Sequence, residues 1–79
     1  MTELLSLLNL FYACDIAAET RFPTPQEWAT CMGYYAQIKA LFAPELSGPE
    51  AQMEGYLRWK TWEAEKAALV AEMRENARL

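Results

Sequence analysis

The chain has 79 residues, of which 53% are hydrophobic and 13% aromatic, and it carries a net charge of −4. This length predicts one domain, residues 1–79, with a marginal core, because so short a chain buries only about 60–65% of its unfolded surface. The apolar content exceeds what a lone three-helix domain readily hides. We therefore expect an apolar patch that a partner or a second copy of the chain covers.

The charge is unevenly divided along the chain. Residues 1–55 carry two cationic and seven acidic side chains, whereas residues 56–79 carry five and four. This acidic balance argues against direct nucleic-acid binding, which needs cations to neutralise phosphates. A basic or mixed surface of another protein is the expected target.

The sequence contains no histidine, which removes most general-base, catalytic-triad and zinc-ligand chemistry. Its two cysteines, Cys14 and Cys31, are too few for a four-thiolate metal site or a disulfide framework. We interpret both as buried thiols in a reducing compartment, with an intramolecular bridge between them as the alternative. The sequence thus predicts a protein that is not an enzyme and needs no metal or cofactor.

The first predicted helix spans residues 3 to about 20. Its leucines and aromatic residues cover more than half of the circumference, which is typical of a helix buried between others. The apolar run from Leu4 to Cys14 is shorter than the ~20 residues that a membrane-spanning helix needs. It also lacks the basic start of a signal peptide, so we expect a cytoplasmic protein that does not bind membranes.

The second predicted helix spans residues 25–43. Thr24 and Glu27 form a capping box around Pro25, and Pro44 ends the helix. The apolar stripe recurs at spacings of three and four residues and consists of Trp28, Cys31, Tyr35, Ile38 and Phe42. Gly33, on the small and polar back of this helix, suggests a close approach of another helix.

The third predicted helix is the longest, spanning residues 48–78 and reaching about 45 Å at 1.5 Å per residue. A second capping box, Ser47 with Glu50, marks its start, and Gly55 is its expected weak point. The fold class is therefore all-α, a compact three-helix domain with the first helix packed between the other two.

The middle of the third helix is the best candidate for a binding site. It gathers aromatic, cationic and acidic side chains, namely Glu54, Tyr56, Arg58, Trp59, Lys60 and Trp62. Tryptophan, tyrosine and arginine dominate interface hot spots, so the stretch predicts a protein-binding patch. In the alternative interpretation, Trp59 and Trp62 face the core while the cations are solvated. A single-stranded nucleic-acid platform is disfavoured, because it needs a positive groove.

Two groups of carboxylates are weaker candidates. An acidic face could mimic nucleic-acid phosphates, although a solvated surface that keeps the protein soluble explains it more simply; its members are Glu3, Asp15, Glu19, Glu45, Glu50 and Glu54. Asp15 and Glu19, one turn apart, could act in acid–base chemistry or bind a divalent cation, but the sequence offers no third ligand near them.

The chain resembles the small acidic proteins that phages and prophages encode to block host machinery, anti-CRISPR proteins among them. The resemblance rests on its size, acidity, high apolar content, absence of catalytic residues and compact helical plan. The resemblance implies a stoichiometric inhibitor that occupies a nucleic-acid-binding or assembly surface of a larger host protein complex, such as a CRISPR effector. It assigns no site residues. The alternative is a helical homo-oligomer with a structural or adaptor role, such as a phage assembly component.

Overall fold

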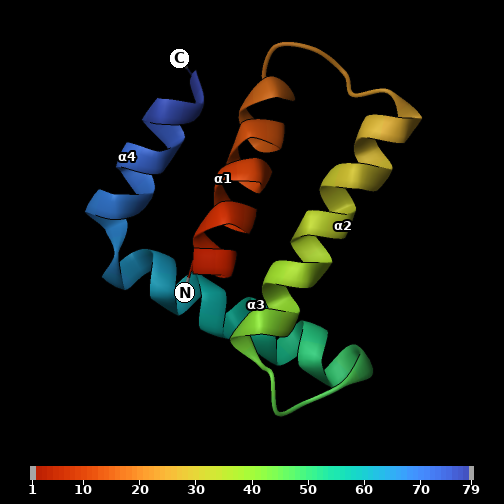
Figure 1. Cartoon of the computed structure of the whole chain (residues 1–79), viewed down its shortest axis with the longest axis vertical. Helices are drawn as coiled ribbons and strands as arrows, with labels where there is room; N and C mark the ends of the chain where they lie inside the picture. The colour runs from red at the N-terminus through yellow and green to blue at the C-terminus, as the bar shows by residue number, and fades with distance from the viewer. Residues whose placement is uncertain (1, 79) are drawn as a thin grey trace.

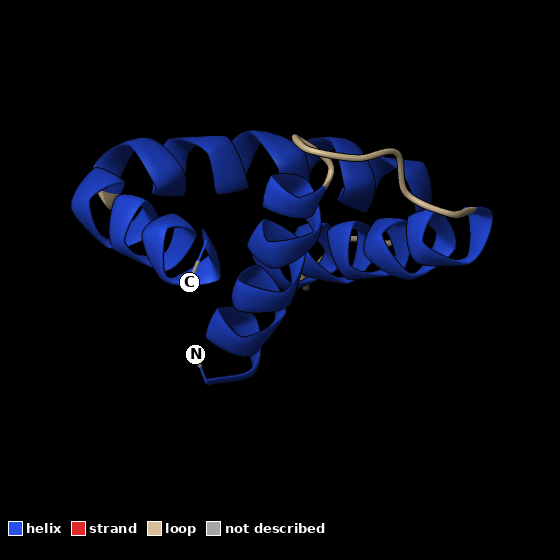
Figure 2. Cartoon of the chain, turned by 90° about the horizontal axis from the view of Figure 1, so that it is seen from above, coloured by secondary structure: helices blue, strands red, loops and turns tan. Residues whose placement is uncertain are grey.

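The structure is a computed structural model that describes residues 2–78. Four helices make up this range: α1 (Thr2–Ala17), α2 (Pro25–Phe42), α3 (Gly48–Glu65) and α4 (Ala67–Arg78). Short loops join them, and no strand lies among the described residues (Figure 2). The all-α prediction is confirmed. The prediction of three helices is wrong, because the chain divides the expected third helix into α3 and α4.

The helices form a flat body of 35 × 31 × 19 Å, in which α1 is the central element. α2 packs along one side of α1 and α4 along the other, while α3 crosses below them (Figure 1). α2 runs antiparallel to α1, and α4 runs in the same direction as α1. The predicted central position of the first helix is correct, but its two neighbours are α2 and α4.

The core lies where α1 meets the other three helices. Its buried members are Leu4, Leu7, Leu8, Tyr12, Ile38, Trp59 and Met73. The Phe11 ring stacks on Tyr35 at 5.5 Å and meets Trp59 edge-on at 5.3 Å, so aromatic contacts join α1, α2 and α3. α1 ends at Ala17, three residues earlier than predicted, and continues as a hydrogen-bonded turn.

The start of α2 is the one expected from the sequence. The Thr24 hydroxyl accepts a hydrogen bond from the Glu27 amide at 3.1 Å, and the Glu27 carboxylate accepts one from the Thr24 amide at 2.9 Å. The start of α3 differs, because the Ser47 side chain makes no capping hydrogen bond. Gly48 has a φ of +63°, so the first turn of α3 lacks the regular geometry that a capping box needs.

The two helical glycines have roles opposite to those predicted. Beyond the neighbouring residues and backbone of α2 itself, no atom lies within 4 Å of the position that a Cβ would take at Gly33, so no other helix approaches it. At Gly55 a Cβ would overlap the backbone of Lys39, because α3 crosses α2 at this point. Gly55 is therefore the close-packing residue, and Gly33 lies on an open surface.

The division between α3 and α4 falls at Lys66, whose φ and ψ of −110° and 35° leave the helical range. The turn directs α4 back along α1, where Met73 enters the core. Arg74 pairs with Asp15 at 2.9 Å, and Arg78 pairs with Glu19 at 3.1 Å. A straight helix over residues 48–78 would forgo these contacts, which explains why the chain turns.

Candidate functional site

The structure separates the six residues predicted to form a binding patch. Trp59 is fully buried and belongs to the core, so the prediction that it contacts a partner needs correction. Arg58, Glu54 and Trp62 line one edge of α3. Tyr56 and Lys60 lie on the other edge, with the Lys60 ammonium 5.4 Å from the Tyr56 ring.

Arg58 holds the end of α2 against α3. Its guanidinium forms a two-point ion pair with Glu45, with distances of 2.6 and 3.0 Å, and donates to the Phe42 carbonyl at 3.0 Å. The hydrogen bonds between Arg58 and Glu45 raise the pKa of Arg58 and lower the pKa of the Glu45 carboxyl. Glu54 adds a second contact at 3.3 Å. Arg58 thus satisfies a carbonyl at the α2 end, and its charge is already neutralised.

The other edge of α3 carries a polar link to α1. Lys60 pairs with Glu63 at 3.1 Å, and the buried Tyr12 hydroxyl donates to Glu63 at 2.6 Å. Burial, followed by this hydrogen bond, raises the pKa of Tyr12. The Lys60 ammonium also lies 4.9 Å from the centre of the Trp59 ring, so its charge interacts with groups of the same chain.

The outward face of α3 displays two apolar side chains that the predicted patch omitted, together with Tyr56, which it included. Met53 is 72% exposed and Leu57 is 54% exposed, and Tyr56 is partly exposed beside them. Their spacing of three and four residues places all three on one side of the helix. We call Met53, Tyr56 and Leu57 the α3 stripe. Met53 and Leu57, which lie next to patch residues in the sequence, were the signal that could have revealed the α3 stripe.

The two cysteines form a disulfide, with 6.0 Å between their Cα atoms. The prediction of two buried thiols is wrong, since Cys14 on α1 and Cys31 on α2 are bonded and only partly buried. Disulfides persist in oxidising surroundings, so the bridge does not support the expected reducing compartment. It joins the two helices between two surface grooves.

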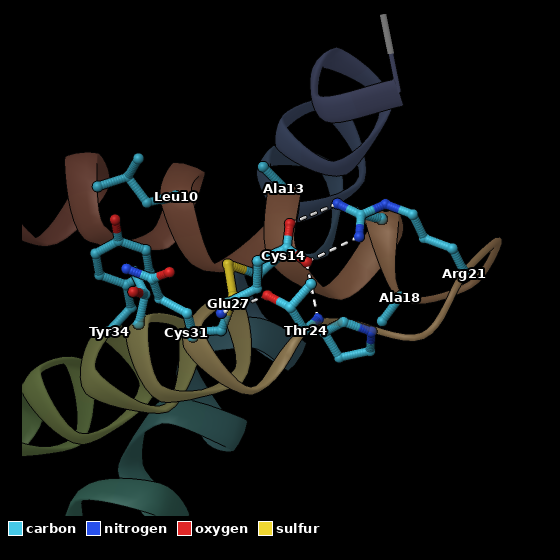
Figure 3. Close-up of a pocket in the computed structure, with 13 residues that line it drawn as sticks. Leu10, Ala13, Cys14, Ala18, Arg21, Thr24, Glu27, Cys31 and Tyr34 are labelled. Atoms are coloured by element: carbon cyan, nitrogen blue, oxygen red, sulfur yellow. Dashed lines mark hydrogen bonds and ion pairs between the residues drawn. A yellow bond between two sulfur atoms is a disulfide. The ribbon is translucent and has the colours of Figure 1, made fainter.

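Each face of the α1–α2 pair has a groove, and the disulfide borders both. The first, of about 510 Å³, is flanked by Leu10 and Tyr34, with Arg21 and Glu27 near its other end; we call it the Leu10 groove (Figure 3). The second, of about 230 Å³, is the Trp28 groove. Its walls are mainly apolar and consist of Phe11, Cys14, Asp15, Ala18, Pro23, Trp28, Cys31, Met32 and Tyr35.

The carboxylates considered for cation binding are engaged in ion pairs. Asp15 and Glu19 both contact Arg74, and Glu19 also contacts Arg78. Within residues 2–78, no cluster of three or more potential metal-ligating side chains is found. The same range holds no helix with the length and apolarity needed to cross a membrane.

Arg21 and Glu27 form a two-point ion pair at one end of the Leu10 groove, with distances of 2.7 and 2.8 Å (Figure 3). The hydrogen bond from Arg21, followed by that from the Thr24 amide, lowers the pKa of Glu27 from 4.5 to about 2. The lowered pKa means that the folded chain favours the ionised carboxylate. Its contribution to stability is complete above pH 4.5 and is lost as the pH falls toward 2.

We expect Glu27→Gln to flatten the acid dependence of stability in this interval. The free energy of unfolding of the native chain should fall between pH 4.5 and 2 by more than that of the variant. Urea unfolding followed by circular dichroism at several pH values measures both curves. Arg21→Ala should flatten the curve partially, and identical slopes for native chain and Glu27→Gln would contradict the assignment.

No protein family model matches the chain, and comparisons with curated proteins and with solved structures find no match.

Proposed function

We propose that the protein is a non-catalytic binding protein that docks on a larger protein through the α3 stripe. The observation that carries the proposal is the exposure of Met53 and Leu57 on the outward face of a well-anchored helix. An amphipathic helix that presents large side chains at this spacing fits an apolar groove of a partner. Glu50 and Glu65, exposed at either end of α3, favour a groove bordered by cations.

Three features support a role without catalysis. The chain has no histidine, and both cysteines are bonded to each other, so neither supplies a thiolate nucleophile. The paired carboxylates Asp15 and Glu19 are neutralised by arginines. The finer proposal, taken from the resemblance described above, is a phage- or prophage-encoded inhibitor that occupies a nucleic-acid-binding or assembly surface of a host complex. Its cytoplasmic location stays a prediction, and the disulfide weighs against it.

The test compares the native chain with Leu57→Glu as baits in affinity capture, because Leu57 is exposed and glutamate is a good helix former. Ala29→Glu is the matched control, since it adds the same charge to an exposed position of α2. We expect a protein captured by the native chain and the control, at one fixed stoichiometry, to be lost with Leu57→Glu. Equal capture by all three baits would reject the α3 stripe.

A further inference from the structure

The Trp28 groove lies beside the most exposed large apolar side chain among the described residues. Phe22, in the turn between α1 and α2, is 97% exposed, and the next residue, Pro23, lines the groove. Trp28 is 59% exposed and Met32 is 40% exposed on the α2 wall. A projecting aromatic ring and an apolar recess are thus adjacent on one surface, which we call the Trp28 face.

The size of the recess indicates the kind of occupant. At about 230 Å³ it is smaller than the ~300–1,000 Å³ typical of small-molecule sites, and the disulfide closes it between the two helices. A single apolar side chain suits this volume and lining. Phe22 is such a side chain, and every copy of the protein presents one next to its own recess.

The charges around the Trp28 face favour a second copy over a basic partner. Asp15 is paired with Arg74, Glu19 with Arg78, and Arg21 with Glu27. The acidic groups near the groove are therefore already neutralised, and they offer no free negative charge to attract a cationic surface. At this face, unpaired carboxylates therefore add no local repulsion between two approaching copies.

The area of the molecule is also consistent with such a contact. The accessible surface is 5376 Å², whereas a folded monomer of this mass averages about 4,900 Å².

We propose that two copies of the chain form a two-fold symmetric dimer in which Phe22 of each copy enters the Trp28 groove of the other. Such an interface is self-complementary, because the same projection and the same recess occur on both sides. It covers Phe22, Trp28 and Met32 in both copies. The dimer leaves the α3 stripe free, so this proposal is independent of the proposed partner-binding role.

The test measures the solution mass of the oxidised full chain by sedimentation equilibrium over a concentration series. We expect a concentration-dependent dimer for the native chain, and for Phe22→Ser a dimer dissociation constant about tenfold higher or more. Phe22 is almost fully exposed, so its replacement leaves the fold intact, which circular dichroism verifies. Trp28→Ser should have the same effect. Leu10→Ser is the matched control, because it alters the groove on the opposite face of the helix pair.

Several outcomes would overturn the proposal. They are a native chain that stays monomeric at every concentration, a Phe22→Ser dimer as tight as the native one, and equal weakening by Leu10→Ser. Copies linked by a disulfide on a non-reducing gel would also reject it. The partner-capture test keeps the two proposals apart. Capture that is lost with Leu57→Glu but kept with Phe22→Ser would support the α3 stripe, whatever the sedimentation results show about the dimer.

Discussion

Replacing Gly55 by alanine should lower the free energy of unfolding by about 3 kcal/mol, although alanine is the better helix former. The added Cβ would overlap the backbone carbonyl of Lys39 in the last turn of α2, and a backbone atom of a packed helix cannot move aside cheaply. α2 and α3 would have to separate where they cross. Urea unfolding followed by circular dichroism measures the loss.

Gly33→Ala is the matched control, because it makes the same substitution in a helix at a position where the added Cβ would meet no other part of the chain within 4 Å. Only the helix-propensity gain remains there, so stability should rise by up to about 1 kcal/mol. The two variants should therefore change stability in opposite directions. A stabilised Gly55→Ala variant would show that α3 does not cross α2 at this residue.

Trp59→Ala should cost about 3–5 kcal/mol, because the side chain is fully buried and contacts aromatic rings from α1 and α2. A single core in a domain of this size supplies only about 3–5 kcal/mol, so we expect the variant to be largely unfolded at 25 °C. Thermal and urea unfolding monitored by circular dichroism test this expectation.

Met53→Ala provides the comparison for Trp59→Ala within the same helix. Met53 is mostly exposed on the α3 stripe, so its truncation should change stability by no more than about 0.5 kcal/mol. A Trp59→Ala variant as stable as Met53→Ala would place Trp59 at the surface and restore it to the candidate binding patch.

Local signals in the sequence predicted the second helix well. The capping box of Thr24 and Glu27 depends only on neighbouring residues, and the apolar stripe of α2 has regular helical spacing. The division of the third helix has no such signal, since residues 62–70 contain neither glycine nor proline. It follows from contacts with α1, in particular those of Met73 and Arg74, and such contacts are distant in sequence.

The candidate site was harder to predict than the fold for a related reason. Which side of α3 is buried depends on its crossing with α2 at Gly55, and the sequence pattern does not reveal that crossing. Trp59 was therefore grouped with its exposed neighbours, and Met53 and Leu57 of the α3 stripe were omitted. The pairing of Cys14 with Cys31 likewise required the spatial arrangement of α1 and α2.

The disulfide gives the α1–α2 pair a second covalent connection besides the main chain. The bond and the intervening residues form a closed ring that contains the whole connecting turn, including Arg21 and Phe22. A protease that hydrolyses the peptide bond after Arg21 would therefore produce two fragments that remain one molecule until the bond is reduced. The covalent attachment of α1 to α2 does not depend on an intact backbone in this turn.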